Sequence, residues 1–430
     1  MKDNKFVNSL FQISTLFLFF VNQSITIFGF SKYKAASVLI EWINRFIYLL
    51  IIAWLVYFIV DLILKKESLK KHFVFLWFFG SLSLAAFSFF ISFVRYAKNF
   101  DGVSSAVNYS KNFLLLFLVF TYIFLSAKTK RYTKIIMLSY LIVSLLLSSV
   151  ILLTYVSGIS RVFINQSKKQ LLTLNYGNSN TAGLLLCLLV LSHVFIFFKL
   201  PKKKWMRIAL LVYAIPMLLF LFYLLILTKC RNAYIGLVLC GLIFILLNVV
   251  KSKHSKLVVF SFLVLPIVLS SAYTLLFSGS STLDVLSALF SGKGKPLTSR
   301  GNNWSIAFGF LSKSVLFGNY NDAYTYCAIT NNFSLVGFQN SQLDWMILYG
   351  FIPATLLILS LYFVIKPKIG NNKYDMYRLF VISCWMINIF TSMFETGYFL
   401  SISGIFIFSF MNLGLLENNV MPYESHEIVI

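Results

Sequence analysis

The sequence predicts an all-α protein that crosses a membrane many times, and three observations carry that prediction. Of its 430 residues, 59% are hydrophobic and only 12% are charged, which lies far outside the range of soluble domains. Apolar runs recur at about the 20 residues that a helix needs to cross a bilayer with every backbone N–H and C=O paired internally. The basic residues gather in short clusters between these runs.

About twelve runs meet the length required of a membrane span. They lie near residues 10–30, 38–64, 72–94, 105–126, 134–157, 180–200, 205–227, 232–250, 255–278, 342–365, 376–394 and 397–415. The first run is predicted to stay as a helix, because Asn22 and Gln23 interrupt it and no small-residue cleavage site follows. We therefore expect a single transmembrane domain over residues 1–430.

The basic clusters predict the orientation of this domain. The formal net charge of +24 is compatible with nucleic-acid binding. However, clusters such as KKESLKK and KLPKKKWMR fall between spans, where the positive-inside rule places them. With the N-terminus in the cytoplasm, the cytoplasmic segments have the higher density of Lys and Arg. We expect both termini in the cytoplasm, a plasma-membrane location, and no nucleic-acid partner.

Two outer connections are longer than the others: a medium loop over 158–179 and a large loop over 279–341. Ordered loops of such length are usually functional. The large loop holds an apolar stripe at helical spacing, which predicts a short helix at the outer membrane interface. The stripe consists of Trp304, Ala307, Leu311 and Val315. Trp304 is its expected anchor, and an interface helix without chemistry fits the same periodicity.

Several classes of site are not expected. Neither a G-x-x-x-x-G-K-S/T loop nor a G-x-G-x-x-G loop occurs, so the sequence does not indicate use of a nucleotide. No Asp-x-Asp occurs, and the histidines fall in a span, at cytoplasmic ends or in the tail, so we expect neither a metal nor a cofactor. Cys230 and Cys327 both map outside, and spacing alone leaves a disulfide between them open.

Polar residues gather at the outer ends of the spans. They are Asn180, Arg231, Arg300, Trp304, Gln339, Asn340, Asp344 and Glu395. Taken one at a time, each is explained by solvation at a helix end or by capping. Taken together, two arginines from distant parts of the chain map to one face. Their guanidinium groups are permanently charged and suit bidentate binding of an anion.

Three segments then resemble a known family. In order, LTKCRNAYIGLVLCGLIFILL, LTSRGNNWSIAFGFLSKSVLFGNY and FQNSQLDWMILYGFIPATLLIL look like the three sequence blocks of the O-antigen ligase and polysaccharide repeat-unit polymerase superfamily. These blocks are an arginine that opens a span, an R-x-x-x-W helix that ends in a glycine turn, and an asparagine-led span. YGNSNTAG resembles a fourth block. The resemblance covers residues 176 to 365.

The resemblance implies a GT-C-like fold and a metal-independent glycosyl transfer at the outer face of the cytoplasmic membrane. The donor would be a glycan on polyprenyl diphosphate, held by Arg231 and Arg300. Because a diphosphate is a good leaving group, the barrier chiefly needs cations fixed where negative charge develops. Trp304 would hold the loop helix against the lipid tail or stack on a sugar, and Asn340 would order the mouth of the tenth span. Asn180 is a further substrate-binding candidate. Expected partners are lipid-linked oligosaccharides, membrane lipid, a chain-length regulator and a flippase.

One position departs from the family pattern. Ligases of the superfamily commonly carry a histidine, taken to be the base, where this chain has Gln339, which cannot take up a proton. A base would then be a carboxylate, with Asp344, Glu395 and Asp322 as candidates in falling order. Taken singly, an ion pair with an arginine, a hairpin cap and a solvated loop charge, respectively, explain these three residues better than a catalytic role does. The departure favours a polymerase over a ligase. The Lys-, Asn-, Ile- and Phe-rich composition fits a bacterial source of low GC content, which favours capsule or exopolysaccharide over lipopolysaccharide as the product.

Two readings besides the polymerase stay open. One is a ligase of the same fold, which passes the glycan to another acceptor. The other is a transporter, such as a flippase of lipid-linked sugar. Transporters usually place charges at mid-membrane and show two similar halves. Here one such charge, Arg45, can pair with Glu41 one turn earlier, so it does not by itself indicate a transport pathway. The two halves of the chain also differ, because the largest loop lies between the ninth and tenth spans. A scaffold without activity would explain the helices but not the clustered outer arginines.

Overall fold

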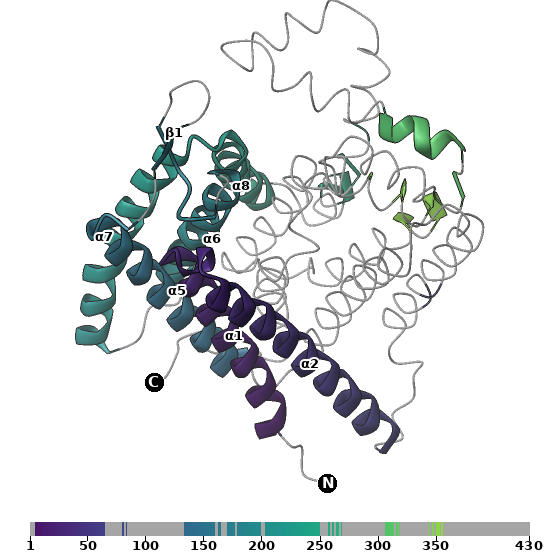
Figure 1. Ribbon diagram of the computed structural model, residues 1–430, viewed down its shortest axis with the longest axis horizontal. Coiled ribbons are helices and arrows are strands. Elements are labelled where there is room, and N and C mark those ends of the chain that lie inside the picture. The colour runs from purple at the N-terminus through teal and green to yellow at the C-terminus, as the bar shows by residue number, and fades with distance from the viewer. Residues whose placement is uncertain are drawn as a thin grey trace, which may run out of the picture.

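A computed structural model of the protein describes residues 5–64, 80, 83, 133–159, 162–164, 170–176, 179–198 and 203–249, and parts of 257–268, 306–318 and 343–355. The described part is mostly helical (Figure 1). Its elements are α1 (Lys5–Ile27), the 3-10 turn η1 (Phe30–Lys32), α2 (Lys34–Leu64), α5 (Thr133–Val156), β1 (Val162–Ile164), β2 (Gln170–Leu172), α6 (Ser179–Phe198), α7 (Lys204–Thr228) and α8 (Arg231–Val249).

The helices α1, α2, α5, α6, α7 and α8 coincide with predicted spans, and most of their ends lie within a few residues of the predicted ones. The spans expected at 72–94, 105–126, 376–394 and 397–415 lie outside the described residues. Those at 255–278 and 342–365 are described only in part. The medium loop holds an antiparallel hairpin of β1 and β2, with Val162 opposite Leu172, which the sequence did not predict.

Two of these helices are long and apolar enough to cross a membrane: α2 over Lys34–Trp54 and α7 over its whole length. The others have 23 residues in α1, 24 in α5, 20 in α6 and 19 in α8. At about 1.5 Å of rise per residue, each approaches or exceeds the roughly 30 Å of hydrocarbon in a bilayer. Length alone therefore suits all of them to a membrane.

The surfaces of α2, α7 and α8 are apolar along most of their length. On α7 the exposed residues include Trp205, Ile208, Val212, Ile215, Leu219, Phe222 and Ile226. Polar side chains are instead buried inside the bundle, among them Thr15, Asn22, Gln23, Ser144, Ser148, Ser192, His193 and Asn232. Exposed apolar surfaces of this extent mark contact with lipid or with other chains. Apolar residues outside and hydrogen-bonded polar residues inside suit a bilayer as solvent.

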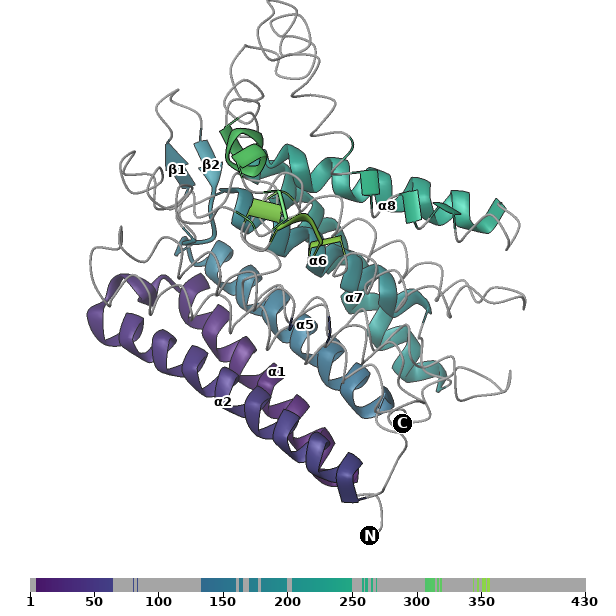
Figure 2. The same cartoon turned by 90° about the vertical axis from the view of Figure 1, so that its right-hand side faces the viewer.

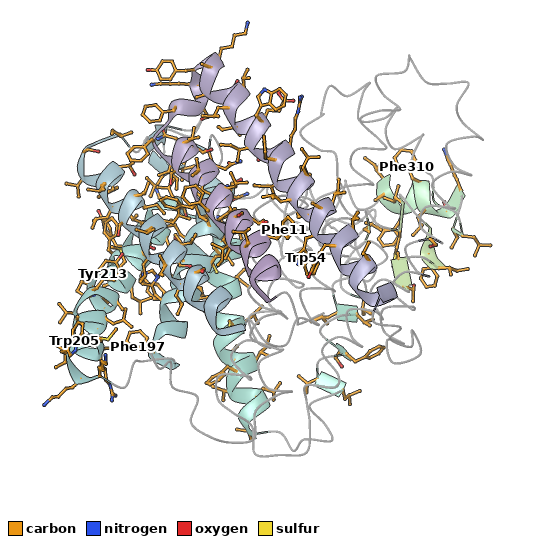
Figure 3. All side chains as sticks on the ribbon, turned by 90° about the horizontal axis from the view of Figure 1, so that it is seen from below. Phe11, Trp54, Phe197, Trp205, Tyr213 and Phe310 are labelled. Carbon is orange, nitrogen blue, oxygen red and sulfur yellow. The ribbon has the colours of Figure 1, made fainter. Side chains whose placement is uncertain are left out.

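Aromatic residues lie near both ends of α7. Trp205, labelled in Figure 3, is 68% exposed, and Tyr223 is 49% exposed. The helix rises about 27 Å between them, close to the thickness of the hydrocarbon core. The Tyr223 hydroxyl lies 3.2 Å from that of Tyr155 on α5. Tryptophan and tyrosine favour the two membrane–water interfaces, so this spacing suits a helix that spans a bilayer.

The helices form a bundle of near neighbours. Helix α1 packs against α2 and α5, and α6 packs against α5, α7 and α8. Figure 2 shows α2, α1 and α5 in succession, followed by α6 and α7 and then α8, with the hairpin at one end. The turn between α1 and α2, the hairpin and the turn between α7 and α8 define this end, which we call the junction end. Its side of the membrane follows from the positive-inside rule and remains a prediction.

Asn175 ties the junction end together. The chain leaves β2 through Leu174 and Asn175, whose φ angles are 47° and 64°. Asparagine is among the few residues that adopt this left-handed region readily. The Asn175 amide donates 2.7 Å to the carbonyl of Ile27 and 3.3 Å to that of Ile159. Because Ile27 ends α1, its carbonyl has no partner within the helix, and Asn175 supplies one.

Asn22 and Gln23, the polar residues that interrupt the first apolar run, also hold α1 in the bundle. Tyr176 donates its hydroxyl hydrogen to Oε1 of Gln23. Burial raises the pKa of the Tyr176 hydroxyl, so it stays protonated and remains a donor. The neighbouring Asn22 donates from Nδ2 to Oδ1 of Asn44 on α2. Asn22 and Gln23 thus link α1 to two other parts of the chain.

The expected pair between Arg45 and Glu41 is confirmed. Nη2 of Arg45 lies 2.6 Å from Oε1 of Glu41, and both side chains are 56% exposed. The guanidinium also lies over the ring of Trp42, 5.0 Å from its centroid. Both residues lie in the part of α2 that is long and apolar enough to cross a membrane, where pairing offsets part of the cost of placing each charge.

The predicted tenth span, 342–365, is not one straight helix. Gly350 has a φ of 92°, which no residue of an α-helix adopts. Residues 343, 346 and 347 before it and residues 351, 352, 354 and 355 after it are helical. The prediction of a continuous helix is therefore wrong at this residue, because an apolar run shows that a segment is buried but not that it is unbroken.

We expect Asn175→Ala to lower the stability of the purified protein by about 1–3 kcal/mol, since it leaves the Ile27 carbonyl without its partner. Backbone strain of up to about 1–2 kcal/mol adds to this loss, because alanine would stand at the φ of 64° that asparagine tolerates. Thermal unfolding is the measurement.

Gly29 gives a second test with an internal control. Both Gly29 and Gly158 have positive φ, 74° and 69°, so alanine costs about 1–2 kcal/mol of backbone strain at either. Only at Gly29 would a Cβ also meet the Asn175 side chain, at 3.2 Å. Thermal unfolding should therefore rank Gly29→Ala below Gly158→Ala, and equal losses would contradict the contact.

Candidate anion-binding site at the starts of α6 and α8

A tight turn fixes the position of Arg231. Helix α7 ends at Thr228, Lys229 has a φ of 53°, and α8 begins at Arg231. Thr228 Oγ1 donates to the carbonyl of Leu225 at 2.7 Å and accepts the N–H of Cys230 at 3.2 Å. Since one hydroxyl serves both the end of α7 and the turn, the backbone before Arg231 has little freedom.

Tyr234 fixes the first turn of α8 from the other side. Its hydroxyl lies 2.9 Å from the carbonyl of Leu225 and 2.9 Å from that of Ile226. These carbonyls belong to the last turn of α7, where the helix itself has no donors left. The contact holds the start of α8 against the end of α7, and Arg231 with it.

The first turn of α6 lies directly against this turn. A Cβ at Gly183 would come within 2.3 Å of the Cys230 Cβ and 2.9 Å of its Sγ, so only glycine fits. The Cys230 thiol lies 3.8 Å from the carbonyl of Asn180. The structure thus brings the predicted residues Asn180 and Arg231 to neighbouring helix starts. The Cys230 side chain is buried, and Cys327 lies outside the described residues, so the disulfide that the sequence left open stays an open prediction.

The electrostatics of this place favour an anion. Helices α6 and α8 both begin here, so their positive dipole ends lie side by side. Neither helix carries an acidic residue in its first turn. The Arg231 side chain is exposed and adds a permanent positive charge. Backbone N–H groups at helix starts and guanidinium groups both bind phosphate, so the site has the chemistry to hold a phosphorylated ligand.

The large loop contributes a helix at the same end of the molecule. Figures 1 and 2 place the helix of residues 306–313 level with the hairpin β1–β2. Ala307 and Leu311 of the predicted stripe are buried within the protein. Val315 does not belong to the stripe: it lies in the turn after the helix and is 46% exposed. The helical spacing of Val315 was therefore a coincidence of sequence, since the helix ends before it.

Most predicted site residues lie outside the described part of the chain. They are Arg300, Trp304, Asp322, Gln339, Asn340, Asp344 and Glu395. Of the predicted set, Asn180 and Arg231 are described, and the structure places them together. That Arg231 and Arg300 converge on one ligand remains a prediction. Among the residues that the structure describes, no group of His, Cys, Asp or Glu is arranged to hold a metal ion.

A second polar cluster was not foreseen. The ring of His193 on α6 stacks on that of Tyr213 on α7, labelled in Figure 3, with centroids 6.4 Å apart. The Tyr213 hydroxyl donates to the carbonyl of Leu145 at 2.9 Å and lies 2.9 Å from Oγ of Ser149. His193 Nδ1 lies 2.8 Å from the carbonyl of Leu189, while Nε2 is buried with no hydrogen-bond partner among the described residues. The sequence shows a histidine in a span, but its neighbours come from other helices.

Comparisons with known proteins add no assignment: no family model, no curated protein and no solved structure matches this chain. The candidate site therefore rests on the residues and contacts described above.

We expect Gly183→Ala to push α6 away from the turn that carries Arg231, because the new Cβ would overlap the Cys230 side chain. Overpacking of this kind costs about 1–3 kcal/mol. The measurement is maleimide labelling of Cys230 in a chain that keeps it as the only cysteine. Cys230 is 1% exposed, so it should label slowly in the parent and faster in Gly183→Ala.

Gly241→Ala is the matched control. It is also a glycine in a described helix, but nothing lies within 4 Å of a Cβ built there. Its labelling should match the parent, and its stability should stay equal or rise by up to about 1 kcal/mol from helix propensity. Equal labelling of Cys230 in both variants would contradict the close contact between α6 and the turn.

Proposed function

We propose that the protein is a polytopic enzyme of the bacterial cytoplasmic membrane that polymerises lipid-linked oligosaccharide repeat units at the outer face. One observation supports it most: Arg231 opens α8 beside the start of α6, so a fixed cation and two positive helix ends meet at one end of an apolar bundle. The ordered sequence blocks that resemble the O-antigen ligase and repeat-unit polymerase superfamily supply the chemical class. Together they indicate a membrane site for a lipid diphosphate.

The proposed reaction transfers the growing glycan from its polyprenyl diphosphate to the non-reducing hydroxyl of a new lipid-linked unit. The bond between the anomeric carbon and the diphosphate oxygen breaks, and a glycosidic bond to the acceptor oxygen forms. The acceptor proton passes to a carboxylate, with Asp344, Glu395 and Asp322 as candidates in that order. The products are the lengthened lipid-linked glycan and free polyprenyl diphosphate.

In this proposal the cations act on the leaving group. Arg231 and Arg300 bind the diphosphate oxygens, where negative charge develops as the bond breaks. The starts of α6 and α8 add their N–H groups. Asn180, Trp304, Gln339 and Asn340 are the expected substrate contacts. The proposed chemistry needs no metal ion, since the guanidinium groups of the two arginines would supply the positive charge that a metal ion supplies in other enzymes.

The transporter alternative also has an observation in its favour. His193 and Tyr213 form a buried polar cluster in the bundle, about 21 Å along α6 from its first residue. Ionisable residues within a membrane often mark ion or substrate pathways. At this depth His193 is too far from Arg231 to serve as the base of the proposed transfer. A transporter would therefore need His193, whereas the polymerase would not.

We expect Arg231→Ala and Arg300→Ala each to abolish long polymer, because removing one preorganised charge contact typically costs about 10²–10³ in rate. Arg231→Lys should recover part of the activity, since lysine keeps the charge but not the bidentate geometry. Arg207→Ala, an exposed arginine near the opposite end of α7, is the control and should leave chain length unchanged. Gel analysis of the glycan is the measurement.

The same gel separates polymerase from ligase. Loss of a polymerase leaves single repeat units on the acceptor, whereas loss of a ligase leaves the acceptor bare. Normal chain length in both arginine variants would rule out the superfamily.

We expect His193→Phe to keep polymerisation, because the proposed chemistry takes place at the junction end. His193→Gln, which retains a hydrogen-bonding side chain, guards against misfolding and should behave in the same way. If export of lipid-linked units stops in His193→Phe while Arg231→Ala is harmless, the transporter is the correct function.

A further inference from the structure

A single glycine joins two helical segments in the predicted tenth span. The N–H of Gly350 donates to the carbonyl of Met346 at 2.9 Å, which closes the last turn of the first segment. The carbonyl of Gly350 accepts the N–H of Ala354 at 3.2 Å, which begins the second segment. Its φ of 92° lies where residues with a Cβ are strained. The break therefore depends on this residue being glycine.

A bond from the large loop is fitted to this break. The N–H of Phe351 donates to the carbonyl of Val315 at 2.8 Å. In an unbroken α-helix the same N–H would donate to the carbonyl of Ile347, four residues earlier. Phe351 can reach Val315 only because the helix is interrupted, so the break and the bond from the loop depend on each other.

The local sequence also suits an interruption here. Pro353 has no N–H, and in a continuous helix it would leave the carbonyl of Tyr349 without its partner. In the first turn of a new helix the missing N–H costs nothing, because that group would have no partner within the helix. Gly350 and Pro353 together therefore favour two segments over one.

The two segments and the loop helix all bury apolar side chains. Leu343, Met346 and Ile347 are buried before the break, and Ala354 is buried after it. On the loop helix, Ala307 and Leu311 are buried. Each piece is thus held in the protein by its own packing, and the bond between Val315 and Phe351 sets how the loop helix and the second segment sit together.

We propose that Gly350 is a positioning residue, which together with the Val315 carbonyl forms a joint that holds the 306–313 helix in register with the broken span. The proposal rests on the proposed function, since residues close in sequence to the joined segments include Arg300 and Asp344. The joint sets the relative placement of the diphosphate-binding loop and the span that supplies the base. Gly350 itself touches neither substrate.

The test compares alanine with asparagine at this position. Alanine at a left-handed φ is strained by about 1–2 kcal/mol, so Gly350→Ala favours a continuous helix in which Phe351 turns back to Ile347. Asparagine adopts positive φ more readily, so Gly350→Asn keeps the break. We expect Gly350→Ala to lose long polymer and Gly350→Asn to retain most of it. If Gly350 matters only because it is small and buried, the larger asparagine is the worse variant, and that order overturns the proposal.

A cross-linking measurement reads the joint without relying on activity. Leu316 and Ile352 each follow a residue of the Val315–Phe351 bond and are 52% and 44% exposed. In a chain with its native cysteines replaced, Leu316→Cys with Ile352→Cys should cross-link through a short bismaleimide. The yield should hold with Gly350→Asn and fall with Gly350→Ala. An unchanged cross-linking yield in the alanine variant would contradict the proposed joint, whatever the polymer length.

The outcome for the proposed function is separate. Normal polymer in Arg231→Ala and Arg300→Ala would contradict that function, and the cross-linking yield would still test the joint.

Discussion

The amide of Asn175 is the contact on which the junction end depends. It takes up the last carbonyl of α1 and that of Ile159, and Gly29 leaves the room it needs. Helix α6 starts only a few residues later, so the level at which that helix begins is set by this tie. Gly183 then seats α6 against Cys230, and the next residue is Arg231. The Asn175 amide and the Gly183 contact thus both bear on where the backbone of Arg231 lies.

These contacts share a physical reason. Within a bilayer there is little hydrophobic gain when helices associate, because lipid tails are as apolar as leucine. Close approach at small residues and hydrogen bonds between helices must then specify the packing. Gly183 provides the first, and the bonds of Asn22 and Tyr176 provide the second. The apolar outer faces of α2, α7 and α8 need no specific partner, since lipid can cover them.

How far the sequence predicts this structure depends on the range of the interactions involved. The ends of the described helices were predicted well, because span length and flanking charge are local properties. The hairpin β1–β2 was missed, since strands of three residues are too short to show alternation. Gln23 was recognised as polar, but its partner Tyr176 is distant in the chain and carries no local signal. Gly350 and Pro353 are compatible with a break, but a glycine is also tolerated within a helix, and the positive φ of Gly350 and its neighbour's bond to the distant carbonyl of Val315 are seen only in the structure. For the candidate site, sequence blocks pointed to Asn180 and Arg231, but their adjacency depends on the turn at Cys230.

The charge at the junction end argues for an anionic ligand rather than for a purely structural role. A cation at a helix start opposes the helix dipole, at a cost of about 0.3–1 kcal/mol. Lysines begin α1, α2 and α7 as well, so the cost at Arg231 is not unusual in this chain. What distinguishes Arg231 is the second helix start beside it, which adds positive potential where none is needed for folding. Thr228 and Tyr234 also hold this backbone more firmly than an exposed surface arginine requires. In the proposed function, a phosphate group of the ligand would bind at this cation and the two helix starts, and rigidity would serve to keep the cation where negative charge develops.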